Sequence, residues 1–421
     1  MRRTKYVLAG LVWLVALGRT WAGDWPRFRG PDGTGVSEET SLPLTWSRTE
    51  NVRWRAELPA AGNSSPVVAR SKVLITCATE GGAQRGLYCY DRRDGRLLWS
   101  QSVAFTGNEP THATNPPCAS SPATNGEVVV VWHGSAGVHC YDLQGQVRWS
   151  RDLGVFRHIW GYAASPVIYR DRVLLNCGPG RRSFVIALAL DDGRTLWQVD
   201  EPGDDGEPAP GTDRGQWIGS WSTPQVIAVD GREQVIVSLP HEVKSYDLQS
   251  GEVIWTCAGL GDLVYTSPVV GSGFCVAMSG YHGPAIALRL GGSGDVTATH
   301  RLWHATQQNP QRIGSGVILG PFMYLANANG VMHCLHVESG ELRWQARLAE
   351  SIWGSLLAAE GRLYVTDQAG TTYVMAANPE RLEVLAENRL EEPSNSTPAF
   401  SDGEIFLRTF QALYCIGRQG G

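Results

Sequence analysis

Short apolar stretches separated by Gly, Ser and Asp recur along the chain, and each has the length of a β-strand. In the first complete group, SPVVARS, KVLITCA, GLYCYD and RLLWSQSV are separated by turns at Arg70-Ser71, Glu80-Gly81-Gly82 and Asp94-Gly95. Turn residues between such stretches predict antiparallel strands joined by hairpins. Four strands of this kind make up one blade of a β-propeller.

The four-stranded group is repeated along the chain. Its segment LYCYDRRDGRLLW returns as VHCYDLQGQVRW and VKSYDLQSGEVIW. Six units open with a small hydroxyl residue and proline, at Ser65-Pro66, Ser121-Pro122, Ser165-Pro166, Thr223-Pro224, Ser267-Pro268 and Thr397-Pro398. Two degenerate openers lie near Gly316 and Ser355. Eight units at intervals of roughly 40 to 58 residues predict an all-β, eight-bladed propeller of four-stranded blades.

The two ends of the repeat region are incomplete in complementary ways. An extra strand around Trp54 precedes the first opener, and the last unit, STPAFSDGEIFLRTFQALYCI, has three strands. Pairing of the N-terminal strand with the C-terminal blade would close the ring and cover two strand edges that otherwise promote aggregation.

A glycine and a tryptophan mark the last hairpin of most units. The closing strand carries Trp at 99, 149, 197, 255, 303 and 344, and the unit near residue 384 lacks it. Gly95, Gly145, Gly193, Gly251 and Gly340 precede five of these strands. We interpret the pair as a device that docks neighbouring blades, because a repeated buried aromatic is far more often core than chemistry.

Residues 1–22 have the pattern of a secretory signal. Arg2, Arg3 and Lys5 precede an apolar run from Tyr6 to Leu17, which is shorter than the ~20 residues of a membrane span. We therefore predict a signal peptide over 1–22, an extended lead-in over 23–50 and one propeller domain over 51–418, exported to the periplasm or outside the cell. No Cys follows the apolar run, so we expect no lipid anchor and no transmembrane span after cleavage.

Cleavage would leave 32 basic and 41 acidic side chains, a formal net charge of −9. An acidic protein without a basic stripe is a poor partner for nucleic acid. The chain lacks the common zinc, nucleophile-elbow, phosphate-loop and dinucleotide motifs, so we predict no metal site. Four of its nine cysteines share one repeat position, which predicts small buried side chains that are not redox pairs: Cys89, Cys140, Cys334 and Cys415.

The tryptophan motif resembles that of quinoprotein-type propellers, as does the lead-in DWPRFRGPDGTGVSEETSLPLTW. That family includes dehydrogenases that bind pyrroloquinoline quinone (PQQ) and a lipoprotein that assists outer-membrane β-barrel assembly. In the enzymes the resemblance implies a vicinal disulfide, a calcium ion and a catalytic Asp. No two cysteines are adjacent here, and only Asp262, in GDLVYTSP, is a candidate for that Asp.

Aromatic residues precede several unit openers, on links that return to the propeller axis: Trp160, Tyr162, Trp217, Trp221, Tyr265 and Trp353. Gathered at one mouth of the channel, they could stack on a protein, peptide or saccharide ligand, or they could simply plug the axis. We predict a monomeric binding or scaffold module without a cofactor. The alternatives are a PQQ-dependent oxidoreductase using Asp262, PQQ and calcium, and a scaffold for outer-membrane protein assembly.

Overall fold

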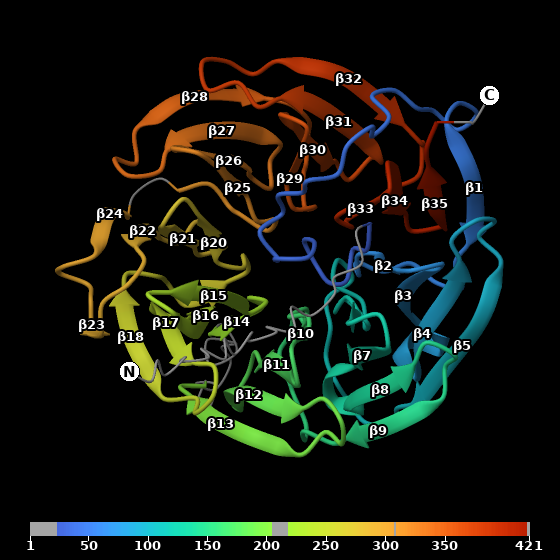
Figure 1. Cartoon of the computed structure of the whole chain (residues 1–421), viewed down its shortest axis with the longest axis horizontal. Helices are drawn as coiled ribbons and strands as arrows, with labels where there is room; N and C mark the ends of the chain where they lie inside the picture. Colours follow the sequence, from blue (N-terminus) through green and yellow to red (C-terminus); the bar gives the residue numbers. More distant parts are fainter. Residues whose placement is uncertain (1–22, 204–217, 307–308, 419–421) are drawn as a thin grey trace, which may run out of the picture.

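The computed structural model describes residues 23–203, 218–306 and 309–418. Eight antiparallel sheets stand around a central axis and follow one another in sequence order (Figure 1). Helix in the described residues is limited to two single 3₁₀ turns, η1 (Glu80–Gly82) and η2 (Gly134–Ala136). The predicted eight-bladed, all-β propeller is confirmed.

Each of the first four blades runs from an inner strand near the axis to an outer strand at the rim. Blade 1 contains β2 (Val67–Ala69), β3 (Lys72–Thr79), β4 (Gln84–Asp91) and β5 (Leu97–Ala104). Blade 2 contains β6 (Ala123–Thr124), β7 (Val128–Trp132), β8 (Val138–Asp142) and β9 (Val147–Arg151). Blade 3 contains β10 (Val167–Tyr169), β11 (Arg172–Cys177), β12 (Ser183–Ala189) and β13 (Thr195–Glu201). Blade 4 contains β15 (Gln225–Val229), β16 (Arg232–Leu239), β17 (Glu242–Asp247) and β18 (Val253–Ala258).

The other blades repeat the order, with two additions near blades 4 and 5. Blade 5 contains β20 (Val269–Gly271), β21 (Phe274–Met278), β22 (Ala285–Arg289) and β24 (Arg301–Ala305). Blade 6 contains β25 (Val317–Leu319), β26 (Phe322–Ala326), β27 (Val331–His336) and β28 (Leu342–Arg347). Blade 7 contains β29 (Leu357–Ala359), β30 (Arg362–Thr366), β31 (Thr371–Ala376) and β32 (Val384–Arg389). The additions are β23 (Gly294–Asp295), which pairs with β18, and the parallel pair of β14 (Gly219–Ser220) with β19 (Leu263–Val264).

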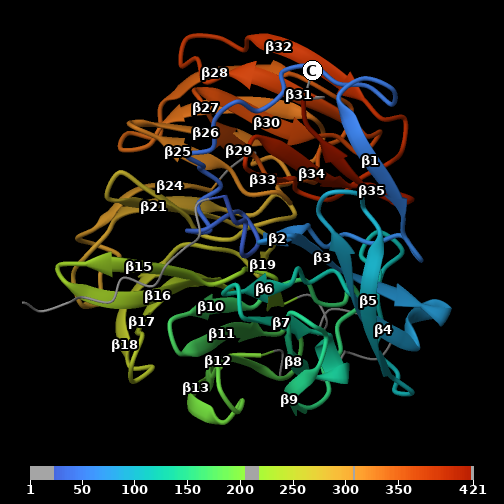
Figure 2. The same ribbon diagram turned by 45° about the vertical axis from the view of Figure 1, so that its right-hand side comes forward.

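Blade 8 is built from both ends of the chain. Its sheet has the order β1-β35-β34-β33, where β1 spans Val52–Glu57, β35 Ala412–Ile416, β34 Glu404–Arg408 and β33 Ala399–Ser401. β1 pairs antiparallel with β35 along its length, and the two strands lie side by side in Figure 2. The predicted pairing of the N-terminal strand with the last three strands is therefore present.

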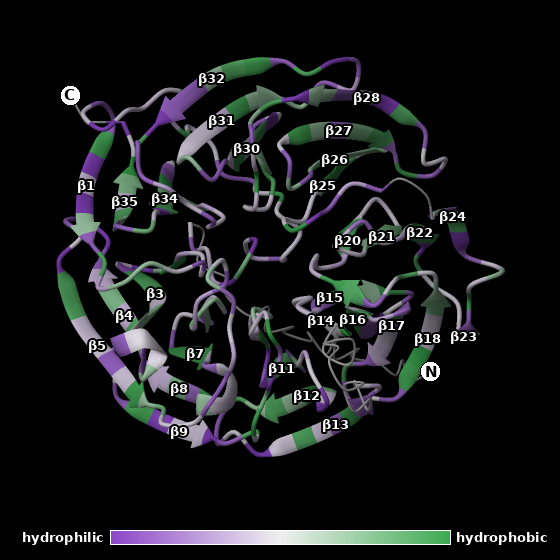
Figure 3. Ribbon diagram, turned by 180° about the vertical axis from the view of Figure 1, so that it is seen from behind, coloured by the Kyte–Doolittle hydropathy of each residue, from purple (hydrophilic) through white to green (hydrophobic). Residues whose placement is uncertain are grey.

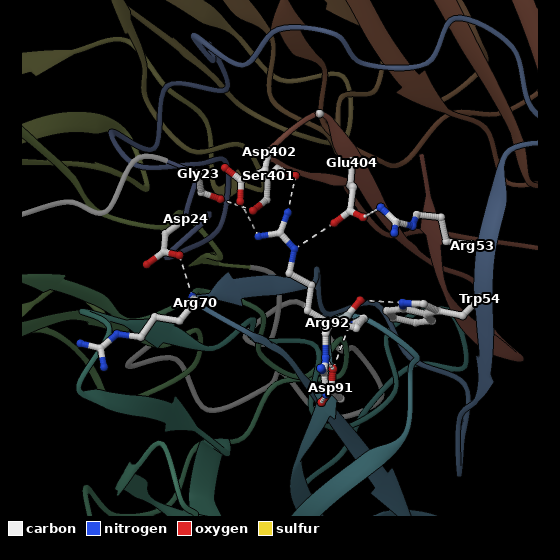
Figure 4. A network of polar contacts seen from close by, with 12 residues as sticks. Gly23, Asp24, Arg53, Trp54, Arg70, Asp91, Arg92, Ser401, Asp402 and Glu404 are labelled. Carbon is white, nitrogen blue, oxygen red and sulfur yellow. Dashed lines mark hydrogen bonds and ion pairs between the residues drawn. The ribbon is translucent and has the colours of Figure 1, made fainter. Parts of the chain in front are cut away.

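Charged side chains join blade 8 to blade 1 (Figure 4). The Arg92 guanidinium donates to Glu404 Oε2 at 2.9 Å, to Asp402 Oδ2 at 2.8 Å and to the Ser401 carbonyl at 2.7 Å. Trp54 on β1 donates its indole N–H to the Arg92 carbonyl at 2.7 Å. The seam between the chain ends thus has charge-assisted hydrogen bonds in addition to apolar packing.

The opener hydroxyls form a continuous ring of hydrogen bonds around the axis. In each blade the backbone N–H of the opener donates to the opener hydroxyl of the next blade, at 2.8–3.1 Å. The last step runs from Thr397 in blade 8 to Ser65 in blade 1. The two degenerate openers keep their serine, so the ring includes all eight members: Ser65, Ser121, Ser165, Thr223, Ser267, Ser315, Ser355 and Thr397.

The predicted docking of tryptophan on glycine holds between neighbouring blades. A Cβ added to Gly95 would lie 2.5 Å from the Trp54 ring, and Gly95 has φ +72°, so the position excludes other residues. Four more pairs repeat this contact: Gly145 with Trp99, Gly193 with Trp149, Gly251 with Trp197, and Gly340 with Trp303. Each of these Trp side chains also donates its indole N–H to a carbonyl of the next blade.

Three interfaces depart from the docking pattern. At one, Trp344 of blade 6 donates its indole N–H to the Asn378 carbonyl of blade 7 at 3.0 Å without a turn glycine against its ring. The other two departures have structural causes. In blade 7 the Trp position is Ala386, opposite Val374. The next blade takes its outer strand from the N-terminus, so it has no β35-to-outer-strand hairpin on which a Trp could dock. Trp255 is fully buried and donates to Gln234 Oε1 of its own blade at 3.1 Å, because the corresponding turn of blade 5 is replaced by the segment that contains β23.

The lead-in crosses the centre of the ring (blue in Figure 1). Trp25 forms a bridge with Val68 in blade 1, and Val36 forms one with Ala358 in blade 7. Between these bridges, Arg29 is 1% exposed and donates to the Thr34 carbonyl at 2.6 Å and to the Gly316 carbonyl. The lead-in is thereby fastened across the axis.

Replacement of Trp54 by Ala should destabilise the fold strongly. The substitution removes a 7% exposed ring and the indole hydrogen bond across the seam, and buried Trp-to-Ala changes typically cost ~3–5 kcal/mol. The measurement is the midpoint of urea unfolding, monitored by far-ultraviolet circular dichroism.

The control is Val147→Ala, because Val147 is 62% exposed on β9 and surface changes usually stay within about 0.5 kcal/mol. Equal urea midpoints for Trp54→Ala and Val147→Ala would contradict the docking role of Trp54.

Candidate functional site

A cavity of about 370 Å³ lies on the propeller axis. All eight ring hydroxyl residues line it and form its floor together with Phe28 of the lead-in. Its walls carry Trp160, Trp221, Tyr265 and Trp353, which lie on links between blades. We call this cavity the axial pocket. The order of the blades explains it, since links from outer to inner strands return to the axis on one face.

The aromatic walls form a connected cluster on one side of the axial pocket. The Trp221 ring lies 5.1 Å from Tyr265 in an edge-on arrangement and 6.2 Å from Trp160. Trp160 is also 5.9 Å from Tyr281, which is 50% exposed. The Trp221 indole donates to the Gly161 carbonyl at 2.9 Å, which fixes its orientation. The side chains therefore present ring faces and edges to a bound molecule.

Four of the six aromatics predicted from the sequence line the axial pocket: Trp160, Trp221, Tyr265 and Trp353. The prediction for Tyr162 is wrong. Its ring packs 5.0 Å from Trp132 and is 3% exposed, and its hydroxyl accepts the Cys118 N–H at 3.3 Å. Gly161, at φ +64°, turns the chain between positions 160 and 162, so the two rings face different ways. Trp217 lies outside the described residues.

The sequence did not predict several of the residues that line the axial pocket. Phe28 lies in the lead-in, far from any unit opener, and only the packing of the lead-in across the axis brings it to the floor. Tyr281 follows β21, on a loop within blade 5 and not on a link that precedes a blade opener. Gln311 and His112 also line the axial pocket, and neither belongs to a repeated position.

The candidates for serving a quinone cofactor are Asp262 and three arginines, Arg157, Arg214 and Arg312. Those among the described residues do not converge on the axial pocket. Asp262 has a 64% exposed side chain with His241 Nδ1 3.7 Å from its carboxylate, and it does not line the pocket. Arg312 is buried beside Asn309, and burial lowers its pKa to about 10. Arg157 is exposed. Arg214 lies outside the described residues.

The described residues do not fit PQQ with a calcium ion. PQQ carries three carboxylates, and its calcium ion needs several oxygen ligands, including carboxylates. No Asp, Glu, Lys or Arg is among the described lining residues. The described chain also contains no group of three His, Cys, Asp or Glu side chains able to hold a metal ion. The ionisable side chains that line the axial pocket are His112, Tyr265 and Tyr281.

A Cys–His contact close to the axial pocket is not an activated nucleophile. Cys118 Sγ lies 3.5 Å from His133 Nδ1. Burial raises the pKa of the Cys118 thiol to about 12, although Arg85 opposes the shift, and burial lowers the pKa of His133 well below its usual value. The thiol therefore stays protonated at neutral pH and is a poor nucleophile. Tyr265 stays protonated as well, because burial raises its pKa.

These observations define a class: an eight-bladed β-propeller with an aromatic pocket on its axis and a floor of hydroxyl groups. The family described as outer membrane protein assembly factor BamB matches residues 11–256, 83–310 and 292–381. The chain belongs to this family. No curated protein matches its sequence.

Solved structures share the fold at low identity. BamB from Moraxella catarrhalis is 14% identical with a TM-score of 0.59, covering 86% of this chain and 98% of its own. The quinohemoprotein alcohol dehydrogenase from Comamonas testosteroni is 12% identical with a TM-score of 0.66, covering 95% and 81%. A europium-containing methanol dehydrogenase is 11% identical with a TM-score of 0.63, covering 93% and 90%. At such identities the likeness shows the fold alone.

All nine cysteines should be inert in the folded protein. Each is buried and free, and burial raises the pKa of Cys334 to about 11 and of Cys89 and Cys140 to about 12. At pH 8 a thiol reagent such as Ellman's reagent should release colour only after denaturant is added. Rapid labelling without denaturant, or a disulfide between any two of the repeat-equivalent cysteines found by mass analysis, would contradict this picture.

Proposed function

We propose that the chain is an exported binding module that holds a small, uncharged, polar ligand in the axial pocket. The main observation behind this proposal is that several polar side-chain groups in the axial pocket form no hydrogen bond within the protein. The Tyr265 hydroxyl, the Trp353 indole N–H and the Gln311 side-chain amide form no hydrogen bond with another described residue. All three are neutral, and all three line the pocket.

The size and chemistry of the axial pocket support a small ligand. Its volume of about 370 Å³ lies at the lower end of the range of about 300–1,000 Å³ for small-molecule sites. Aromatic walls supply contact area, and a few neutral donors supply orientation. The described lining contains no acid, lysine or arginine, and His112 is its one side chain of the kind that commonly acts as a general base.

A second candidate function is a scaffold for other proteins, as the name of the family implies. The specific observation is a belt of exposed aliphatic residues on the outer strands, two positions before the Trp of the closing strand or its replacement: Leu97, Val147, Val253, Leu342 and Val384, which are 40–62% exposed. In Figure 3 the outermost strands carry alternating hydrophilic and hydrophobic segments. Among the described residues, no helix is long and apolar enough to cross a membrane.

Ligand binding at the axial pocket should be strongly weakened by replacing Trp160, Trp221 and Trp353 together by Ala. The probes are indole, short aromatic peptides, and mono- and disaccharides, and the readout is isothermal titration calorimetry. The three rings supply most of the wall, at ~0.5–1.5 kcal/mol for each stacking contact, so loss of all three should weaken a bound probe by at least about tenfold.

The control for the triple variant is Leu97→Ala with Leu342→Ala, which removes two members of the exposed belt. Circular dichroism must show that both proteins are folded. If the belt variant loses the probe and the triple variant keeps it, the site lies at the rim and the scaffold function is favoured.

Addition of PQQ and calcium should produce no turnover. Purified protein is mixed with both, together with a panel of alcohols and sugars, and reduction of an artificial electron acceptor is followed. Asp262→Asn serves as the matched variant. PQQ-dependent turnover that disappears in Asp262→Asn would replace the binding function by an oxidoreductase.

A further inference from the structure

The floor of the axial pocket contains more hydrogen-bond donors than the fold uses. Each ring hydroxyl has one hydrogen to donate and two lone pairs, and one lone pair accepts the N–H of the preceding blade. No described residue accepts a hydrogen bond from any of these eight hydroxyls. The eight side chains are only 2–8% exposed and all line the axial pocket, and two of them, Thr223 and Ser267, also line the small cavity next to it. The hydrogens are available to a ligand.

The centre of this floor is apolar and rigid. Phe28 lines the axial pocket and also a small cavity beneath it, so it separates the two. Arg29 fastens the lead-in to the Gly316 carbonyl, and Arg27 donates to the Pro31 carbonyl within the lead-in at 3.0 Å. Phe28 is thus a fixed surface surrounded by a circle of hydroxyl donors.

The charge beneath the floor is positive. Arg27 and Arg29 are 7% and 1% exposed, and neither is in ion-pair contact with a described residue, although the charge of Asp32 acts on Arg27 from a longer distance. Burial lowers their pKa values, to about 10 for Arg27 and about 9 for Arg29, and at neutral pH both remain charged. In a low-dielectric interior their field favours electron-rich oxygen atoms above Phe28 and disfavours a cation there.

We propose that the axial pocket binds a neutral pyranose sugar, with one ring lying across the propeller axis on Phe28. This inference rests on the proposed binding function and names its ligand class. A pyranose ring has an apolar face of C–H groups and a perimeter of oxygen atoms that accept hydrogen bonds. Phe28 matches the face, the hydroxyl circle matches the perimeter, and Trp160 with its aromatic neighbours covers the remaining apolar edge.

Binding is tested by titrating the full chain with methyl β-glucopyranoside and with maltose. The heat of binding is measured by calorimetry, and the fluorescence of the pocket tryptophans gives a second readout. Both sugars should bind. Glucosamine, a cation at neutral pH, should bind at least tenfold more weakly than methyl β-glucopyranoside because of Arg27 and Arg29. Sorbitol, which has hydroxyls but no ring, should not bind measurably.

Two variants test the placement of the sugar. Phe28→Ala should weaken methyl β-glucopyranoside at least tenfold, and Gln311→Met about threefold or more, because Gln311 supplies a free amide without a structural role. Gln101→Met on β5 is the matched control, since it makes the same chemical change outside the pocket, and should leave the affinity unchanged. Thermal melting confirms that each variant is folded.

The possible outcomes distinguish failure of the sugar inference from failure of the proposed binding function. If indole or an aromatic peptide binds and is lost in the triple tryptophan variant while no pyranose binds, the binding function stands and the sugar inference is wrong. If glucosamine binds as well as methyl β-glucopyranoside, or if Phe28→Ala leaves the affinity unchanged, the proposed placement is overturned. If no probe binds at all, both proposals are contradicted.

Discussion

The ring of hydrogen bonds between opener N–H groups and opener hydroxyls is the constraint on which the arrangement depends. At the axis the inner strands converge, and a buried backbone N–H that lacks a partner costs about 1–3 kcal/mol. A Ser or Thr side chain reaches the neighbouring strand without filling the channel, which larger polar side chains would block. The same atoms therefore hold each blade against the next and line the axial pocket. The fold and the floor of the site cannot be altered independently.

The rim carries a second, complementary set of contacts. Trp rings pack on turn glycines of the next blade and donate to its carbonyls, which combines apolar burial with a satisfied indole N–H. The contact is absent at Ala386, where the neighbouring blade has no outer hairpin. At the seam where the chain ends meet, the Arg92 cluster and the Trp54 contact join the first blade to the last.

The fold could be predicted from the sequence because each blade repeats the same local solution. A hydroxyl residue and proline, two-residue turns and a Trp four residues after a Gly can all be recognised without any long-range contact. The site was predicted only in part, since it is assembled across the axis. The position of an aromatic before a blade identified Trp160, Trp221, Tyr265 and Trp353. That rule failed for Tyr162, because Gly161 has a left-handed backbone conformation and the Tyr162 side chain turns away from the axial pocket. It could not find Phe28, which reaches the floor through the packing of a segment outside the repeat.

The axial pocket combines aromatic walls, neutral polar side chains and a floor of hydroxyl donors, and this combination defines the chemistry that the protein offers to a ligand. A crystal structure of the protein grown with methyl β-glucopyranoside tests this account most directly. It should show the sugar ring against Phe28, with its oxygen atoms within hydrogen-bond distance of hydroxyls such as those of Thr223 and Ser267. Sugar bound only at the rim of the propeller, or ring hydroxyls that all donate to protein carbonyls, would contradict the account.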